Sequence, residues 1–102
     1  MSSAFMSALA KEIAAEKAQG LGRTERVMAA ALERYRRLAE TAADSHGKCE
    51  ALWELTASLA SFIIQREACG LTDTDRVLKL YGVPAEAIAR LGARPRASAA
   101  AC

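Results

Sequence analysis

The residues best suited to chemistry lie in one polar stretch, Asp44-Ser45-His46-Gly47-Lys48-Cys49, which holds the only histidine of the chain. An acid, a hydroxyl, an imidazole and a thiol are the residue types of a nucleophilic catalyst, in which a third group orients the base against the nucleophile. Neighbours on one short loop seldom reach that geometry, and no glycine-rich phosphate loop or oxyanion motif accompanies them. We therefore interpret the stretch as a solvated turn with Ser45 or Asp44 as a helix cap, and predict no catalytic residue.

The cysteines do not have the spacing of a metal site. Cys49, Cys69 and Cys102 lie 20 and 33 residues apart, without a C-x-x-C pair and with a single histidine in the chain. An odd cysteine count and an N-terminus without a basic segment predict a cytoplasmic protein with reduced thiols. Cys49 and Cys69 are then expected to pack as small apolar side chains.

Two pairs of glutamates have helical spacing, Glu12 with Glu16 and Glu50 with Glu54. Di-metal helical bundles combine inward glutamates with a Glu-x-x-His motif, which this chain lacks. Both pairs also fall on the polar arcs of their helices, so we expect solvated faces. The sequence predicts no metal and no cofactor.

The elements that position these residues are predicted to be helices. The chain has 102 residues and a mass of 10.9 kDa, the size of one domain. It contains 24 alanines and 11 leucines but only 7 valines and isoleucines together, a composition typical of helices rather than strands. No run approaches the roughly 20 apolar residues of a membrane span. We predict an all-α fold.

An internal similarity refines this prediction. At an offset of 50 residues, the segment 18–28 matches 68–78 at six of eleven positions, without a gap. The shared Gly-Leu pairs, at Gly20 and Gly70, follow apolar periodic runs and have the pattern of a helix C-terminus followed by a tight corner. Each unit then resembles an αα-hairpin. The sequence predicts two hairpin repeats, 3–43 and 48–91, forming a four-helix bundle with a short extra C-terminal helix.

The apolar periodicity sets the expected boundaries within a single helical domain of residues 1–92. The expected helices and connections, in chain order, are helices over 3–19 and 23–43, a loop over 44–47, helices over 48–69 and 73–82, a short helix over 84–91, and a disordered tail over 93–102.

The predicted helix 48–69 has an unusually broad apolar face, covering roughly 200° of arc. Two explanations stay open: the extra face meets a second copy of the chain, or other parts of the same chain cover it. We favour a homodimer seam, or a groove for a partner helix, because a chain this short has few elements to surround a central helix. The expected interface residues are Leu52, Trp53, Leu59, Phe62 and Ile64.

Nucleic-acid binding is the alternative function. The net charge is +2, and the excess comes from two arginines of the tail. A strongly basic footprint is therefore absent, although local contacts stay open. The candidate phosphate contacts are Arg34, Arg37, Arg90, Arg94 and Arg96.

Residues 71–92 also resemble part of a known DNA-binding module. The pattern Leu71-Thr72-x-x-x-Arg76-Val77-Leu78-x-Leu80-x-Gly82-Val83, followed by Ile88-Ala89-x-Leu91-Gly92, is similar to the helix-turn-helix of luminescence-regulator-type transcription factors. The resemblance implies the first two helices of that module. The groove-reading helix should follow, but the next segment, 93–102, contains Pro95 and no apolar stripe.

These observations together predict a non-enzymatic, self-associating helical protein with a structural, regulatory or adaptor role. A weak nucleic-acid-binding protein that uses the helices of 73–91 and the basic tail is the alternative. The sequence identifies neither a ligand nor a pathway.

Overall fold

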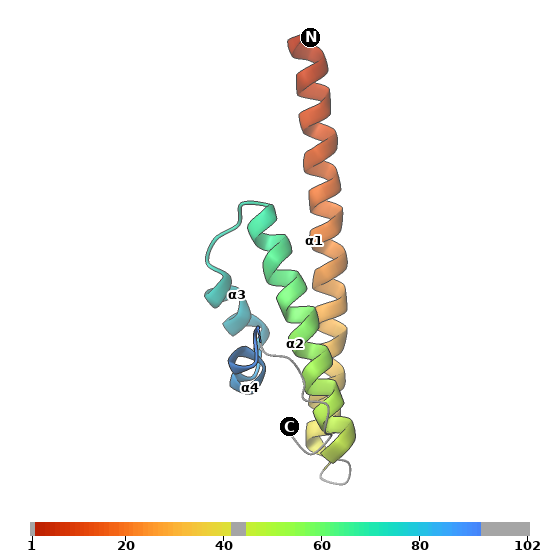
Figure 1. The fold of residues 1–102 in the computed structure, drawn as a ribbon, viewed down its shortest axis with the longest axis vertical. Helices are drawn as coiled ribbons and strands as arrows, with labels where there is room; N and C mark the ends of the chain where they lie inside the picture. Colours follow the sequence, from red (N-terminus) through yellow and green to blue (C-terminus); the bar gives the residue numbers. More distant parts are fainter. Residues whose placement is uncertain (1, 42–44, 93–102) are drawn as a thin grey trace.

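The fold is a long helical hairpin with two short helices packed on one side (Figure 1). The computed structural model describes residues 2–41 and 45–92, and within these ranges every regular element is a helix. The all-α prediction is confirmed for this part of the chain. Helix α1 (Ser3–Glu40) and helix α2 (Ser45–Ala68) run antiparallel, and α3 (Thr74–Tyr81) and α4 (Ala85–Ala89) follow.

Helix α1 is continuous where the sequence predicted a corner. The predicted helices 3–19 and 23–43 are one helix of 38 residues, about 57 Å long at 1.5 Å per residue. Gly20 is buried inside it, and a Cβ there would lie 2.7 Å from Nε2 of Gln65 on α2. A glycine inside a helix costs only about 1 kcal/mol, which the packing of α2 on this face offsets. The hairpin repeat 3–43 is therefore wrong.

The second Gly-Leu pair does form the predicted corner. Gly70 has φ +74°, its N–H donates to the carbonyl of Glu67 at 2.9 Å, and the N–H of Leu71 donates to that of Arg66 at 3.0 Å. These two bonds are those of a Schellman motif, in which a left-handed residue ends the helix. The next helix, predicted over 73–82, begins at Thr74, and the left-handed Asp73 occupies its N-cap position.

The core lies where all four described helices meet. Its buried residues come mainly from one face of α1 and the broad face of α2. They are Met28, Leu32, Tyr35, Ala51, Leu52, Leu55, Leu59, Phe62, Leu78 and Ala87. The broad apolar arc of α2 is thus covered largely from within the chain, by α1 on one side and by α3 and α4 on another.

Polar contacts fasten the two short helices to α1. The hydroxyl of Tyr35 donates to Oε2 of Glu86 on α4 at 2.6 Å, and Nη2 of Arg36 donates to the carbonyl of Tyr81 at 2.5 Å, at the end of α3. Burial, and then the bond to Glu86, raise the pKa of Tyr35 to about 12. Tyr81 also packs edge-on against Phe62, with ring centroids 6.2 Å apart.

Three further expectations meet the structure here. The four-helix bundle is instead a two-helix hairpin with two short helices, because the corner at Gly20 does not form. The predicted loop 44–47 is mostly the first turn of α2, which begins at Ser45. The predicted disordered tail, 93–102, lies outside the described residues. None of the helices in 2–41 and 45–92 is long and apolar enough to cross a membrane.

Candidate functional site

The catalytic residue types at the start of α2 do not assemble into a site. His46 is exposed, and its Nε2 lies 3.2 Å from Oε1 of Glu50, one helical turn along the same helix. Asp44 lies outside the described residues. Cys69, near the end of α2, is a free cysteine.

The paired glutamates take part in ion pairs or face solvent. Glu50 pairs with His46, and Glu54 forms an ion pair and hydrogen bond with Nη1 of Arg34 across the α1–α2 interface. Glu12 and Glu16 are exposed on α1. Among residues 2–41 and 45–92, no group of three or more histidines, cysteines, aspartates and glutamates could hold a metal ion.

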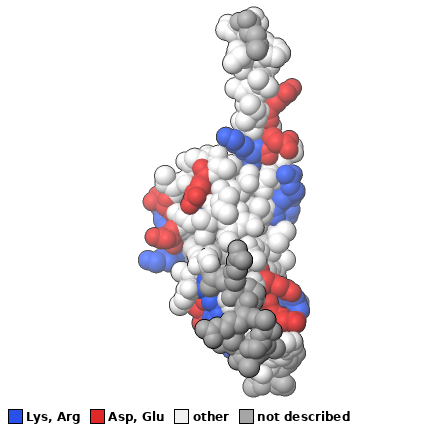
Figure 2. Space-filling model, in the orientation of Figure 1, with Lys and Arg blue, Asp and Glu red and all other residues white. Residues whose placement is uncertain are grey.

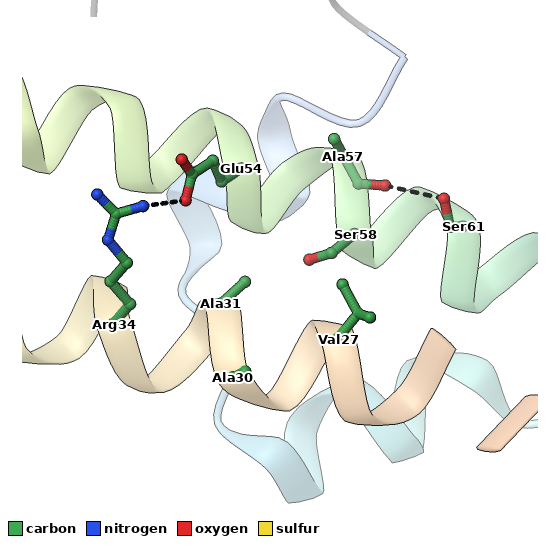
Figure 3. Close-up of a pocket in the computed structure, with 8 residues that line it drawn as sticks. All are labelled: Val27, Ala30, Ala31, Arg34, Glu54, Ala57, Ser58 and Ser61. Atoms are coloured by element: carbon green, nitrogen blue, oxygen red, sulfur yellow. Dashed lines mark hydrogen bonds and ion pairs between the residues drawn. The ribbon is translucent and has the colours of Figure 1, made fainter. Parts of the chain in front are cut away.

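A shallow groove of about 560 Å³ runs along the α1–α2 interface (Figure 3). It is lined by four residues of α1 and four of α2, namely Val27, Ala30, Ala31, Arg34, Glu54, Ala57, Ser58 and Ser61. The Arg34–Glu54 pair bridges the two helices at one end of it (Figure 3).

The hydroxyls of this groove are used within α2. Ser58 donates to the carbonyl of Leu55 at 2.9 Å, and Ser61 donates to the carbonyl of Ala57 at 3.3 Å. The remaining lining consists mostly of methyl groups of alanine and valine. The groove therefore offers van der Waals contact rather than acid–base or nucleophilic chemistry.

The predicted interface residues divide between the core and the surface. Leu52, Leu59 and Phe62 are buried inside the monomer, so in this conformation they cannot contact a second copy. Trp53 is half-buried, with the guanidinium carbon of Arg90 5.5 Å from its ring centroid. Ile64 alone among the five is fully on the surface, 64% exposed.

Two of the three predicted phosphate contacts that the structure describes have partners within the monomer. Arg34 is paired with Glu54, and Arg90 lies over Trp53. Arg37 is exposed in the last turn of α1. Arg94 and Arg96 lie outside the described residues.

The most unusual surface is the first half of α1, which projects beyond the body of the molecule (Figure 1). We call residues 3–16 the arm; every residue from 2 to 19 is exposed. Four large apolar side chains of the arm are 39–52% exposed, and we call them the arm stripe: Phe5, Met6, Leu9 and Ile13. The tip of the arm, residues 2–10, carries no charged side chain, as the white upper part of Figure 2 shows.

A second groove, of about 570 Å³, lies at the base of the arm, beside the turn between α2 and α3. We call it the arm groove; it is lined by Ala10, Ile13, Ala14, Lys17, Ala18, Leu21, Cys69 and Leu71. The groove begins where α2 ends. Nε2 of Gln65 and Sγ of Cys69 lie 3.4 and 3.5 Å from the carbonyl oxygen of Lys17, to which both donate.

Comparison with known proteins places the chain in one family. Residues 2–99 match the model of a family of unknown function, DUF6665. The chain belongs to this family. No curated protein and no solved structure matches it. The resemblance of 71–92 to luminescence regulators therefore stays a sequence prediction. The DUF6665 match includes the arm, so the projecting half of α1 belongs to the family domain rather than to an extension outside it.

The apolar residues of the arm have a different role from the one that the sequence predicts. Phe5, Leu9 and Ile13 form one apolar face of a helix, and the hairpin prediction turns that face inward. A comparison of helix lengths could have predicted the exposed arm. Residues 3–40 carry periodic apolar side chains over more than ten turns, whereas α2 is long enough to cover only the last six or seven.

Proposed function

We propose that this member of DUF6665 is a non-enzymatic self-association module, in which two copies pair through the arm of α1. The observation that supports this proposal is the arm stripe, a row of half-exposed large apolar side chains on a helix with no neighbour. Exposed apolar rows of this kind mark interaction surfaces in soluble proteins.

The arm also needs a partner to be well ordered as a helix. Isolated helices shorter than about 12–15 residues are marginal in water, even when they are rich in alanine. The arm has 14 residues and contacts no other helix along most of its length. Its cap, the hydroxyl of Ser2 accepting from the N–H of Phe5 at 3.2 Å, contributes only about 1 kcal/mol. A second helix along the stripe would supply the missing packing.

A second copy is a suitable partner because the arm and the residue that follows it, 3–17, carry no net charge. This segment contains two lysines, Lys11 and Lys17, and two glutamates, Glu12 and Glu16. Two arms can therefore approach without net repulsion. The nucleic-acid alternative has no comparable support, since Arg34 and Arg90 already have partners within the monomer.

The expected dimer is weak. Burying the exposed half of each stripe side chain in both copies contributes about 8 kcal/mol, at roughly 1 kcal/mol per side chain. Association costs at least about 4 kcal/mol in lost freedom, which leaves at most about 4 kcal/mol, so the dissociation constant is expected in the millimolar range.

The test is the absolute mass in solution, by light scattering or sedimentation over that concentration range. The wild-type mass should rise from 10.9 kDa towards twice that value. Ile13→Glu, which places a charge in the stripe of both copies, should weaken the dimer at least 30-fold, the equivalent of about 2 kcal/mol. Val27→Glu is the matched control, since Val27 is an exposed apolar residue of the same helix outside the arm. A wild type that stays at 10.9 kDa, or a dimer indifferent to Ile13→Glu, overturns the proposal.

A further inference from the structure

The face of α1 that packs on α2 continues into the arm. At 100° per residue, Met6, Ala10 and Ile13 project from the same side of α1 as Met28 and Tyr35, which are buried against the body. From Gly20, the first buried residue of α1, this face is covered by α2, and upstream of Gly20 it is exposed. A helix lying on the arm would therefore take the place that α2 would occupy if α2 were longer.

The position of α2 decides the direction of a second copy. A partner whose α1 ran parallel to this one would meet α2, which packs on the same face of α1 from Gly20 onward (Figure 1). If the partner's α1 ran antiparallel, the core of the partner would lie beyond the tip of this arm, where it meets no part of the first copy. The partner's N-terminus would then point at the end of α2, so that the two helix dipoles follow head to tail. Only the antiparallel arrangement lets two arms overlap along their whole length.

The residues of the open face fix the register. Ile13 is large and Ala10 is small, and both lie near the centre of the face. In an antiparallel pair, setting Ile13 opposite Ala10 of the other copy also sets Ala10 opposite Ile13, so two large–small contacts form by symmetry. Met6 lies seven residues before Ile13, and Lys17 lies seven residues after Ala10. Met6 of one copy therefore falls opposite Lys17 of the other. The partner's tip thus reaches the arm groove, beside Leu21 and Leu71.

We propose, on the basis of the self-association above, that two arms pair antiparallel and that Met6 of each copy seats in the arm groove of the other, against Leu71 and the aliphatic stem of Lys17. The arm groove is then the receptor for the tip of a second copy. Each groove is built from the base of one copy's arm and the α2–α3 turn of the same copy, and the tip of the other copy's arm fills it.

The experiment pairs two charge variants. Met6→Lys and Leu71→Glu should each weaken the homodimer at least tenfold, because each places an unpaired charge at both contacts. An equimolar mixture should recover dimer to within about threefold of wild type. The mixed dimer has one opposite-charge contact and one wild-type contact. Leu80→Glu is the matched control for Leu71→Glu, since Leu80 is exposed on α3 outside the groove. It should neither weaken the dimer nor rescue Met6→Lys.

A second readout does not depend on the folding of the Leu71 variant. Cys69 is a half-buried free thiol that lines the arm groove. Its rate of alkylation, followed by peptide mass spectrometry, should fall several-fold as wild-type protein is concentrated into the dimer, and should stay constant in Ile13→Glu.

The two ways in which the proposal can fail are distinguishable. A monomeric wild type overturns both proposals. A dimer that Ile13→Glu disrupts, but in which the mixture shows no rescue and Cys69 stays equally reactive, supports pairing through the arm and overturns the groove as its receptor.

Discussion

The continuity of α1 can be tested by replacing its glycines. In the structure Gly22 is helical, and a Cβ there would have Nη1 of Arg26, the end of a flexible side chain, at 3.3 Å as its nearest neighbour. Gly22→Ala should therefore stabilise the protein by about 0.5–1 kcal/mol, the ordinary gain of alanine over glycine within a helix. Gly20→Ala should be near neutral, because the same gain is offset by displacing Gln65 from its bond to Lys17.

Gly70→Ala is the comparison. Gly70 has φ +74°, and no other side chain or backbone atom lies within 4 Å of the place that a Cβ would take, so the substitution adds backbone strain without a steric clash. We expect it to destabilise the protein by about 1–2 kcal/mol. The two Gly-Leu pairs, alike in sequence, should thus respond differently to the same change.

The assay is urea unfolding followed by circular dichroism. All variants carry Ile13→Glu, so that dimerisation does not contribute to the free energy of unfolding. A change of 1 kcal/mol corresponds to a shift of about 0.3–1 M in the urea midpoint for a small domain. If Gly20→Ala is as destabilising as Gly70→Ala, then Gly20 is left-handed, α1 has the corner that the repeat predicted, and the arm as described does not exist.

Two further changes test the core and its polar fastening. Leu59→Ala should lower the free energy of unfolding by about 2–5 kcal/mol because Leu59 is fully buried, whereas Ile64→Ala, on the exposed side of the same helix, should change it by less than about 0.5 kcal/mol. A dimer that Ile64→Ala weakens would instead restore the seam along α2. Tyr35→Phe should remove one pH-dependent part of the stability. The pKa of Tyr35 is about 12 in the folded protein against 10 in the unfolded chain, so its contribution is complete below pH 10 and is lost as the pH rises from 10 to 12. Melting at a series of pH values checks this, and an unchanged alkaline slope in Tyr35→Phe would refute the assignment.

Local signals predicted the helices well, and they failed where two distant segments meet. The corner at Gly70, the helix end at Gly82 and the short helix after Pro84 follow from residues within a few positions of each site. Gly20 has the same local signal as Gly70, but it lies inside a continuous helix and is packed against Gln65, 45 residues away. The breadth of the apolar face of α2 also follows from the sequence alone. Which elements cover that face depends on where α3 and α4 pack, which the sequence does not give.

The continuity of α1 and the proposed dimer depend on each other. With a corner at Gly20, residues 3–19 would fold back along 23–43, the stripe would be buried in the monomer, and no surface would be left to pair. With a continuous helix, the stripe extends beyond the reach of α2, whose 24 residues cover only the second half of α1. The length difference between the two helices therefore creates both the exposed stripe and the groove at its base. Lengthening α2 should compete with a second copy for the same face, whereas shortening the arm should abolish pairing and leave the core intact.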